Sequence, residues 1–349
     1  MAATELPTSC AHPTVRGIST YTVFGFVGYG VANIVGAILS YAWQLSLSDR
    51  LITFLLPPLS FLAVVYLARR IVRKERIVFY QTTIAGVATV AIASAITGGQ
   101  LARCVDITVV GIGIFLVFGR IGCFSVACCH GRPARFGIVY GADHVKLGFW
   151  SRWSGRRLWP VQLVESAASL ALVVAALVFG WTDPGRPALI YAVGYGLVRF
   201  ALENVRGDSA RPQVLGVSEA QWTTVATLIA CALWRPGILT AVPAALVVVA
   251  ALALIARRRN RELWSAPHLR AIDTSCALAL RDGAPANTPL GLAISCHGLA
   301  DGRLDWVLSS THAAWSTPTA RRVAGALWPR FELVEGRLAG VIHVITEAA

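Results

Sequence analysis

Residues 191–206 read YAVGYGLVRFALENVR, a largely apolar stretch that carries charged residues at regular intervals. Tyr195, Arg199 and Glu203 recur every four residues, so in an α-helix they share one face, and Arg206 follows three positions later. A charged side chain in an apolar spanning segment usually faces the interior of a bundle, where it meets a partner or a ligand. The stretch therefore predicts a membrane helix with one polar face, on which Arg199 either neutralises Glu203 or faces a ligand.

The composition of the whole chain is typical of a membrane protein. Of the 349 residues, 56% are hydrophobic and 14% are charged, and the mean hydropathy is +0.62. Soluble domains have about 45–50% apolar and about 25% charged residues, and a membrane helix takes about 17–25 residues. We expect an all-α polytopic membrane protein with seven or eight transmembrane helices, from apolar blocks at 20–46, 51–68, 77–98, 104–119, 161–181, 187–204, 217–234 and 237–256.

The pattern changes after the basic run at 257–261. Residues 262–349 alternate polar and apolar positions, with strand-like LGLAIS, LDWVLSS and LAGVIHVIT around a helix expected near 317–328. We therefore divide the chain into an N-terminal tail at 1–19, a transmembrane domain at 20–256 and a small soluble α/β domain at 262–349. The sequence indicates no role for the soluble domain, whose Cys296 and histidines lack metal-ligand spacing.

The net charge of +13 does not indicate nucleic-acid binding. The basic residues border apolar blocks, which is the pattern that membrane topology and anionic head groups produce. The chain carries no nucleic-acid motif. We therefore expect the lipid bilayer, and no nucleic acid, among its partners.

A second polar stretch, GRIGCFSVACCHGRP at 119–133, closes the fourth apolar block. Gly119 and Gly122 flank Arg120, and glycine lets the backbone come close to a ligand. An arginine in this setting can donate two hydrogen bonds to a phosphate. The stretch predicts a loop that handles an anionic ligand.

Polar residues of other blocks are expected on the same side of the membrane. Gln162 and Glu165, three positions apart at the start of the fifth block, share one helix face. Two crossings separate Arg120 and this pair from Glu203 and Arg206, so all of them reach the same membrane face. Arginines with a few carboxylates at a membrane boundary suit an anionic lipid head group.

Three cysteines and a histidine lie within eight positions of the loop: Cys123, Cys128, Cys129 and His130. Zinc sites usually pair C-x2–4-C with a second ligand pair at a distance, and adjacent cysteines rarely point the same way. We expect thiols that line a ligand pocket first, a redox or acyl-accepting role second and metal binding last. No metal and no cofactor are therefore predicted.

Three ordered motifs, GRIG-F-x6-GRP, P-x-QL-x-E and GYG-x2-R-x3-E-x2-R-x-D, resemble those of the prolipoprotein diacylglyceryl transferases over about residues 20–234. The resemblance implies a multi-pass protein of the plasma (inner) membrane. It also implies transfer of a diacylglyceryl group from phosphatidylglycerol to the lipobox cysteine of a prolipoprotein, with release of glycerol phosphate. The rival hypothesis is a catalytically inactive lipid-binding protein whose C-terminal domain recruits a partner.

The resemblance also implies roles for single residues. Arg120, Arg199 and Glu203 match family positions that act in catalysis, and Arg206 matches one that acts in lipid binding. The substrate-binding residues expected from the motifs and from the pocket interpretation are Gly119, Gly122, Cys123, Cys128, His130, Gly131, Gln162, Glu165, Tyr195 and Arg206.

The chain departs from the family pattern at several of its polar positions. Cys123, Val126 and Cys128 stand where the family usually has asparagine, asparagine and glutamate, and Tyr80 stands where an essential histidine is expected. One hypothesis makes Tyr80 a base activated by Arg120 or Arg199, because an unperturbed tyrosine, with a pKa of about 10, is a poor base. The alternative is an aromatic residue at the lipid interface, with His130 as the second candidate base.

Charge counting and family resemblance disagree on topology. Up to residue 261, twenty Lys and Arg residues lie on the membrane face that carries the 121–160 loop and leads into the C-terminal domain, against four on the other face. The positive-inside rule places that richer face in the cytoplasm, whereas the resemblance implies that the active face lies outside it. For the C-terminal domain we follow the charge count, which places it in the cytoplasm, and we leave the side of the active face open.

Overall fold

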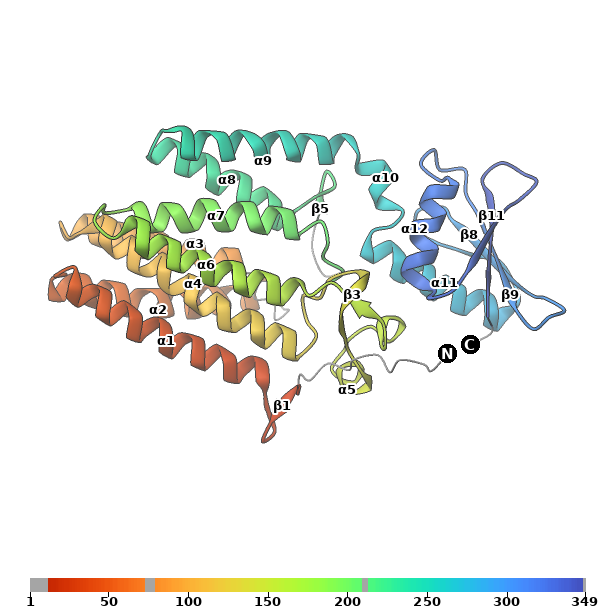
Figure 1. Ribbon diagram of the computed structural model, residues 1–349, viewed down its shortest axis with the longest axis horizontal. Coiled ribbons are helices and arrows are strands. Elements are labelled where there is room, and N and C mark those ends of the chain that lie inside the picture. Colours follow the sequence, from red (N-terminus) through yellow and green to blue (C-terminus); the bar gives the residue numbers. More distant parts are fainter. Residues whose placement is uncertain (1–11, 73–78, 209–212, 348–349) are drawn as a thin grey trace.

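The computed structural model describes residues 12–72, 79–208 and 213–347. Eight helices lie side by side in one bundle, and each falls within or close to one of the apolar blocks of the sequence (Figure 1). The helical fold expected of this region is confirmed. The bounds are Thr20–Ala42 (α1), Leu47–Val72 (α2), Phe79–Ile96 (α3), Leu101–Ser125 (α4), Val161–Gly180 (α6), Arg186–Leu202 (α7), Glu219–Trp234 (α8) and Ile238–Ala256 (α9).

Five of these helices are long and apolar enough to cross a membrane: α1, the Leu47–Ala68 part of α2, α4, α6 and α9. Helix α3 is apolar over Tyr80–Ile96 but shorter, and α7 and α8 have 17 and 16 residues. The shorter helices include α7, which carries the polar face of residues 191–206. The described part of the chain thus gives five candidate spans, and the total of seven or eight stays a prediction.

Helix α4 lies at the centre of the bundle, packed against α1, α3, α6 and α7. A Cβ atom on Gly113 would lie 2.6 Å from Cε2 of Tyr191, so glycine permits the close approach of α4 and α7. Ser169 of α6 donates to the Gly113 carbonyl at 3.0 Å and shares a 2.7 Å hydrogen bond with the Tyr191 hydroxyl. Small residues and such hydrogen bonds hold helices together in lipid, where the hydrophobic effect contributes little.

Short elements connect the helices. The loop from α4 to α6 contains β3 (Pro133–Val139), α5 (Ala142–Lys146), a 3-10 turn (Ser151–Trp153) and β4 (Arg157–Leu158), which pairs with β3. Two small hairpins are made by β1 (Thr14–Val15) with β2 (Ile18–Ser19) and by β5 (Gln213–Val214) with β6 (Val217–Ser218). We call residues 126–160 the signature loop from here on.

Beyond the short helix α10 (Arg258–Glu262) the chain forms a five-stranded antiparallel sheet and two helices, which we call the C-terminal domain. The strand order is β10 (Glu332–Glu335), β11 (Val341–Thr346), β9 (Leu304–Ser309), β8 (Ala293–Gly298), β7 (Ala286–Asn287). Helices α11 (Ala266–Asp282) and α12 (Thr317–Leu327) pack on the sheet. Burial alternates along β11, where Ile342 and Val344 face the core. The strands and the helix expected from the sequence are present.

The C-terminal domain packs directly against the signature loop at one end of the bundle (Figure 1). Asp273 of α11 accepts hydrogen bonds from Trp150 Nε1 at 3.1 Å and Arg152 Nε at 2.7 Å. Trp153 Nε1 donates to the Ala326 carbonyl at 3.0 Å. Buried residues of both regions form one apolar core, which includes Tyr140, Phe149, Trp153, Leu269, Ile272 and Leu327.

Candidate functional site

Three backbone segments meet at the end of the bundle where the signature loop begins. The Arg132 N–H donates to the Val205 carbonyl and the Trp159 N–H donates to the Arg132 carbonyl, both at 3.0 Å, while Gly131 pairs with Arg206 in an isolated β-bridge. A Cβ atom on Gly131 would lie only 2.4 Å from the Trp159 carbonyl oxygen. Glycine is therefore needed so that the loop can pass between the start of α6 and the chain after α7.

A fully buried carboxylate, that of Glu165 on α6, lies at the centre of this end of the bundle. Arg120 Nη2 lies 2.9 Å from Glu165 Oε1, and the Tyr195 hydroxyl donates to the same oxygen at 2.8 Å. Arg199 Nε lies 3.7 Å from Oε1, and Arg206 Nη1 lies 4.0 Å from Oε2. The structure thus gathers arginines from α4, from α7 and from the chain after α7 around one carboxylate.

Two further carboxylates flank the arginines. Arg199 Nη2 lies 2.8 Å from Glu203 Oε2, so the pair expected from their four-residue spacing is present. Arg206 donates to both oxygens of Asp208, from Nε at 2.8 Å and from Nη2 at 3.2 Å. With Glu165, three carboxylates balance three guanidinium groups, so the site has no excess of positive charge.

The unusual property of the network is its unpaired hydrogen-bond donors. Arg120 Nε, Arg199 Nη1 and Arg206 Nη1 are buried without a hydrogen-bond partner among the described residues, and so is Glu165 Oε2. A buried polar atom without a partner costs about 1–3 kcal/mol, and more when the group is charged. Three such donors at one place could be satisfied by an anionic ligand that accepts hydrogen bonds.

Tyr80, at the start of α3, belongs to the same region. Its hydroxyl lies 3.4 Å from Thr224 Oγ1 of α8, and Arg199, Glu165 and Glu203 all act on it electrostatically. The first hypothesis named Arg199 as one of its activating neighbours, and the structure brings the two groups together. Thr224 was missed in the sequence, because a threonine in an apolar helix gives no signal of its own.

The glycines of the signature motif serve different purposes. A Cβ atom on Gly122 would lie 3.1 Å from the Tyr21 Cα atom, so this glycine allows α1 and α4 to pack closely. A Cβ atom on Gly119 would meet nothing within 4 Å. Helix packing therefore explains the glycine at position 122, where we expected the approach of a ligand. Gly119, in contrast, leaves open space beside Arg120.

Gln162 and His130 hold the signature loop in its conformation. Gln162 Nε2 donates to the Cys128 carbonyl at 2.8 Å and lies 3.2 Å from the Tyr140 hydroxyl. The buried His130 ring packs edge-on against Phe149 and Trp153, at centroid distances of 5.1 and 5.4 Å. Burial lowers the pKa of His130, so the ring is neutral at neutral pH and belongs to the aromatic core of the loop.

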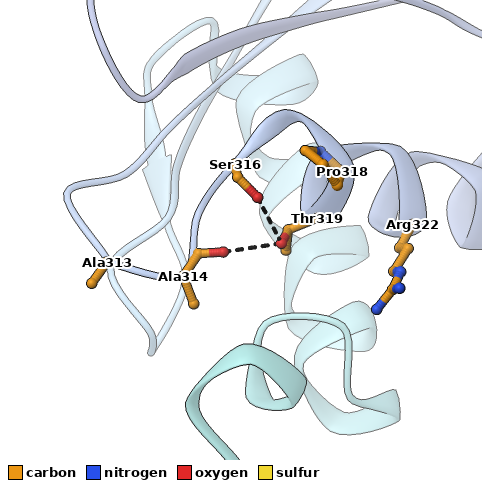
Figure 2. A pocket seen from close by; sticks show the side chains of 6 residues that line it. All are labelled: Ala313, Ala314, Ser316, Pro318, Thr319 and Arg322. Carbon is orange, nitrogen blue, oxygen red and sulfur yellow. Dashed lines mark hydrogen bonds between the residues drawn. The ribbon is translucent and has the colours of Figure 1, made fainter. Parts of the chain in front are cut away.

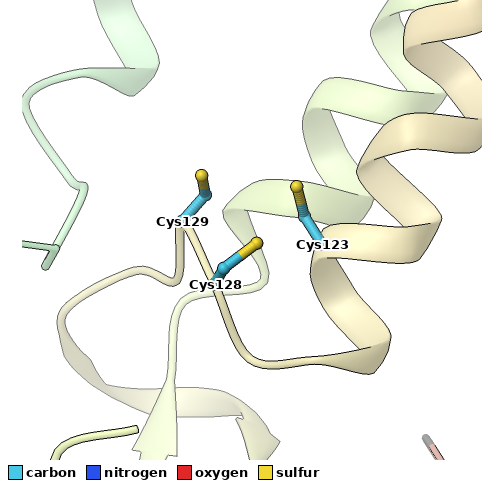
Figure 3. Close-up of side chains that lie close together, drawn as sticks. All are labelled: Cys123, Cys128 and Cys129. Carbon is cyan, nitrogen blue, oxygen red and sulfur yellow. The ribbon is translucent and has the colours of Figure 1, made fainter. Parts of the chain in front are cut away.

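Cys123, near the end of α4, comes together with Cys128 and Cys129 of the signature loop (Figure 3). The sulfur atoms of Cys123, Cys128 and Cys129 all lie within 4.8 Å of one another. The expectation that adjacent cysteines point apart is therefore wrong for Cys128 and Cys129. Ala127 and Cys129 have φ angles of 57° and 53°, a left-handed conformation that is uncommon for residues other than glycine, and it turns both thiols to one side.

Cys129 was noted in the sequence with its neighbours but was not among the expected substrate-binding residues. Hydrogen bonds with Cys123 and Cys128, and then the charge of Arg206, hold the pKa of the Cys129 thiol well below its usual range. This cysteine is consequently the thiol of the three that ionises most readily. The left-handed backbone that places it leaves no sequence signal, since cysteine and alanine are not typical of that conformation.

A shallow pocket in the C-terminal domain is separate from this network (Figure 2). It lies at the start of α12, and the Arg322 guanidinium beside it lies 5.4 Å from the Trp264 ring centroid. Its lining contains one charged side chain and no carboxylate, thiol or imidazole: Ala313, Ala314, Ser316, Pro318, Thr319 and Arg322. We therefore place the functional site in the bundle.

The fold and the site define a polytopic membrane protein with a buried arginine–carboxylate network at one end of its bundle. Residues 16–236 match the family model of the prolipoprotein diacylglyceryl transferases. This match covers more than half of the chain, so the protein belongs to that family. The family resemblance read from the three sequence motifs is thereby confirmed.

Two curated relatives have matching names. The chain is 29% identical over 156 residues to the phosphatidylglycerol–prolipoprotein diacylglyceryl transferase 2 of Clostridium perfringens. This matched region covers 44% of the chain and 58% of the relative. The chain is also 29% identical over 154 residues to the phosphatidylglycerol–prolipoprotein diacylglyceryl transferase of Clostridium tetani. This second matched region covers 44% of the chain and 60% of that relative. The matched regions thus span less than two thirds of the length of either relative.

Proposed function

We propose that this protein transfers a diacylglyceryl group from phosphatidylglycerol to the lipobox cysteine thiol of a prolipoprotein, as a multi-pass enzyme of the plasma membrane. Family membership and the names of the two relatives support this reaction. In this reaction the thiol sulfur bonds to a glycerol carbon, the bond from that carbon to the phosphate oxygen breaks, and glycerol phosphate leaves.

The observation that carries the proposal is a set of three guanidinium nitrogens, on Arg120, Arg199 and Arg206, that have no hydrogen-bond partner in the part of the chain that the structure describes. Together they could donate hydrogen bonds to the phosphate of the lipid, whose negative charge grows as the carbon–oxygen bond breaks. Donors fixed where charge develops stabilise the transition state, because they need no reorganisation during the reaction. The buried Glu165 and the Tyr195 hydroxyl hold Arg120 in place through the shared Oε1 atom.

The remaining site residues divide into proposed roles. Glu203 would orient Arg199 through their 2.8 Å contact, and Gly119 would leave space for the head group. Gly131 and Gln162 would hold the loop that closes the site. Tyr80 is the candidate base for the thiol proton, and a Tyr80→Phe variant with undiminished transfer would remove it from that role.

The second candidate function is a catalytically inactive lipid-binding protein whose C-terminal domain recruits a partner. The substitutions Cys123, Cys128 and Tyr80 at family positions favour it. So does the C-terminal domain, which lies outside the family match and packs on the signature loop. The two functions differ in whether the same arginines support turnover.

Complementation of a cell depleted of its own transferase tests the proposal. The wild-type chain should restore growth and lipoprotein modification. Arg199→Gln should fail while still reaching the membrane, because removal of one transition-state donor costs about 10²–10³-fold in rate. Arg235→Gln is the matched control, since Arg235 pairs with the exposed Asp183 outside the site. Failure of the wild-type chain, with protein present in the membrane, would favour the lipid-binding function.

A further inference from the structure

For the formation of the acceptor thiolate, the proposed transfer has only Tyr80 as a candidate base. The family histidine is replaced by Tyr80, and an unperturbed tyrosine, with a pKa of about 10, accepts protons poorly at neutral pH. The buried imidazole of His130 is enclosed by Phe149 and Trp153 rather than facing Arg199. Cys123, Cys128 and Cys129 have no role in the proposed transfer.

The arrangement of these cysteines suits a metal ion. In a tetrahedral zinc site with zinc–sulfur bonds of about 2.3 Å the sulfur atoms lie about 3.8 Å apart. The sulfurs of Cys123, Cys128 and Cys129 already lie within 4.8 Å of one another. Side-chain rotations that shorten each sulfur–sulfur distance by at most about 1 Å would give the spacing of a zinc site. All three are free thiols and none is exposed. Soft thiolate ligands favour zinc over magnesium or calcium.

The surroundings of the cluster fit such a site. Arg120 Nη1 lies 4.0 Å from Cys123 Sγ, while Nη2 of the same guanidinium contacts Glu165, so one side chain joins the thiols to the arginine network. Two left-handed residues shape the turn, and backbone strain of this kind clusters at functional sites. Gln162 fixes the Cys128 carbonyl at 2.8 Å and so supports the turn that presents the sulfurs.

We propose that Cys123, Cys128 and Cys129 bind one zinc ion as a three-thiolate site whose fourth position accepts the thiol of the acceptor protein; this step rests on the proposed transferase function. Catalytic zinc sites have three protein ligands and one open position, and a thiol that coordinates zinc is deprotonated. The acceptor thiol gives its proton to water and its sulfur attacks the glycerol carbon. The bonding pair of the broken carbon–oxygen bond stays with the phosphate, so charge and atoms balance.

Metal analysis of the purified full-length protein in detergent tests the site without reference to activity. We expect one zinc per chain in the wild type and in Cys231→Ser, whose thiol lies on α8 away from the cluster. Loss of zinc is expected in Cys123→Ser, Cys128→Ser and Cys129→Ser. Cobalt added to metal-free wild-type protein should give a sulfur-to-cobalt charge-transfer band. In the same protein, bound zinc should protect these three cysteines from alkylation, as read by mass spectrometry.

Activity then separates this proposal from the transferase function. Arg199→Gln should retain zinc and lose transfer, whereas Cys129→Ser should lose both. The proposal is overturned by wild-type protein with three freely alkylated thiols and no zinc affinity, by a disulfide among them, or by copper in place of zinc. Zinc bound at the three cysteines with no transfer by the wild-type chain would refute the transferase function and leave a structural metal site. Full transfer by zinc-free protein would refute the catalytic role of the metal.

Discussion

The bundle and the C-terminal domain both contain arginine–carboxylate pairs, but the surroundings of these pairs are opposite. The side chains of Arg120 and Glu165 are 7% and 0% exposed, whereas those of Arg303 and Asp301 are 43% and 49% exposed. Exposed pairs contribute about 0–1 kcal/mol, and breaking a buried pair costs about 3–5 kcal/mol because one charge is left uncompensated. Charges buried at this cost, at the end of a membrane bundle, indicate function rather than stability.

The two regions also differ in their relation to the family. The family match ends at residue 236, before the last helix of the bundle and the C-terminal domain. Nevertheless the C-terminal domain shares an apolar core with the signature loop, and Asp273 receives hydrogen bonds from two loop residues, Trp150 and Arg152. The part outside the family match therefore stabilises the part that carries the family motif.

The largest difference between the regions should appear on neutralising one carboxylate in each. Glu165→Gln removes one of the three carboxylates that balance the three buried arginines and leaves one positive charge uncompensated, so we expect a loss of about 3–5 kcal/mol of stability together with loss of transfer. Asp301→Asn, in the exposed pair, should change the stability by less than about 1 kcal/mol. Thermal unfolding of both variants in detergent measures the difference. Equal effects would show that burial does not distinguish the two pairs.

Within the bundle, two glycines of the same motif should respond differently to alanine. Gly131→Ala forces a Cβ atom to within 2.4 Å of the Trp159 carbonyl, so the loop must shift, at a cost of about 1–3 kcal/mol. Gly119→Ala meets no atom within 4 Å and should unfold like the wild type. If Gly119→Ala keeps its stability but loses transfer, the open space beside Arg120 receives the substrate. A stable Gly131→Ala variant would contradict the described loop path.

The contact between the two regions should have a smaller effect. Asp273→Asn weakens the partly exposed contact with Arg152 and Trp150, at an expected cost of about 1 kcal/mol. Hydrogen exchange should accelerate in residues 149–157 of the signature loop. Asp282→Asn, whose carboxylate pairs only with the exposed neighbour Arg281, should leave exchange in the loop unchanged. Unaltered exchange in Asp273→Asn would mean that the domain does not hold the loop.

The smallest effect is a pH dependence confined to the C-terminal domain. Burial lowers the pKa of His268, which contacts the Leu263 carbonyl and Thr288 Oγ1 at 2.7 and 2.9 Å, and His312 lowers it further. The neutral His268 ring contributes fully to the free energy of unfolding above about pH 6.5, the pKa of histidine in the unfolded chain. As pH falls below this value, the contribution is lost by at most about 1.4 kcal/mol per pH unit. The free energy of opening of α11, taken from hydrogen exchange after correction for the intrinsic exchange rate at each pH, should therefore fall between about pH 7.5 and about pH 5.5, and His268→Asn should remove this dependence.

Much of the bundle could be predicted from the sequence, because long apolar runs are almost sufficient to specify membrane helices. Arg199 and Glu203 were predicted to share a helix face, and their side chains are in contact. Glu165 was predicted as a polar residue near the boundary, but its position between three arginines depends on the packing of α4, α6 and α7. No local pattern contains that information.

The signature loop was less predictable than the helices. The gathering of three sulfurs depends on left-handed backbone at Ala127 and Cys129, two residue types that seldom adopt it. Spacing rules for zinc sites consequently did not predict that the three sulfurs lie close together, since these rules describe ligand pairs held by ordinary turns. The packing of the C-terminal domain on Trp150 and Arg152 had no sequence signal either, because surface arginines and tryptophans are common near membranes.

The most direct test of the arginine site is a transfer assay with purified components. Wild-type protein, a lipobox peptide and vesicles of phosphatidylglycerol should yield a peptide heavier by one diacylglyceryl group, with release of glycerol phosphate, as read by mass spectrometry. Arg199→Gln should reduce the rate by about 10²–10³-fold, while Arg235→Gln should match the wild type. Equal rates for wild type and Arg199→Gln would contradict the account, because the three buried guanidinium groups would then have no part in the reaction.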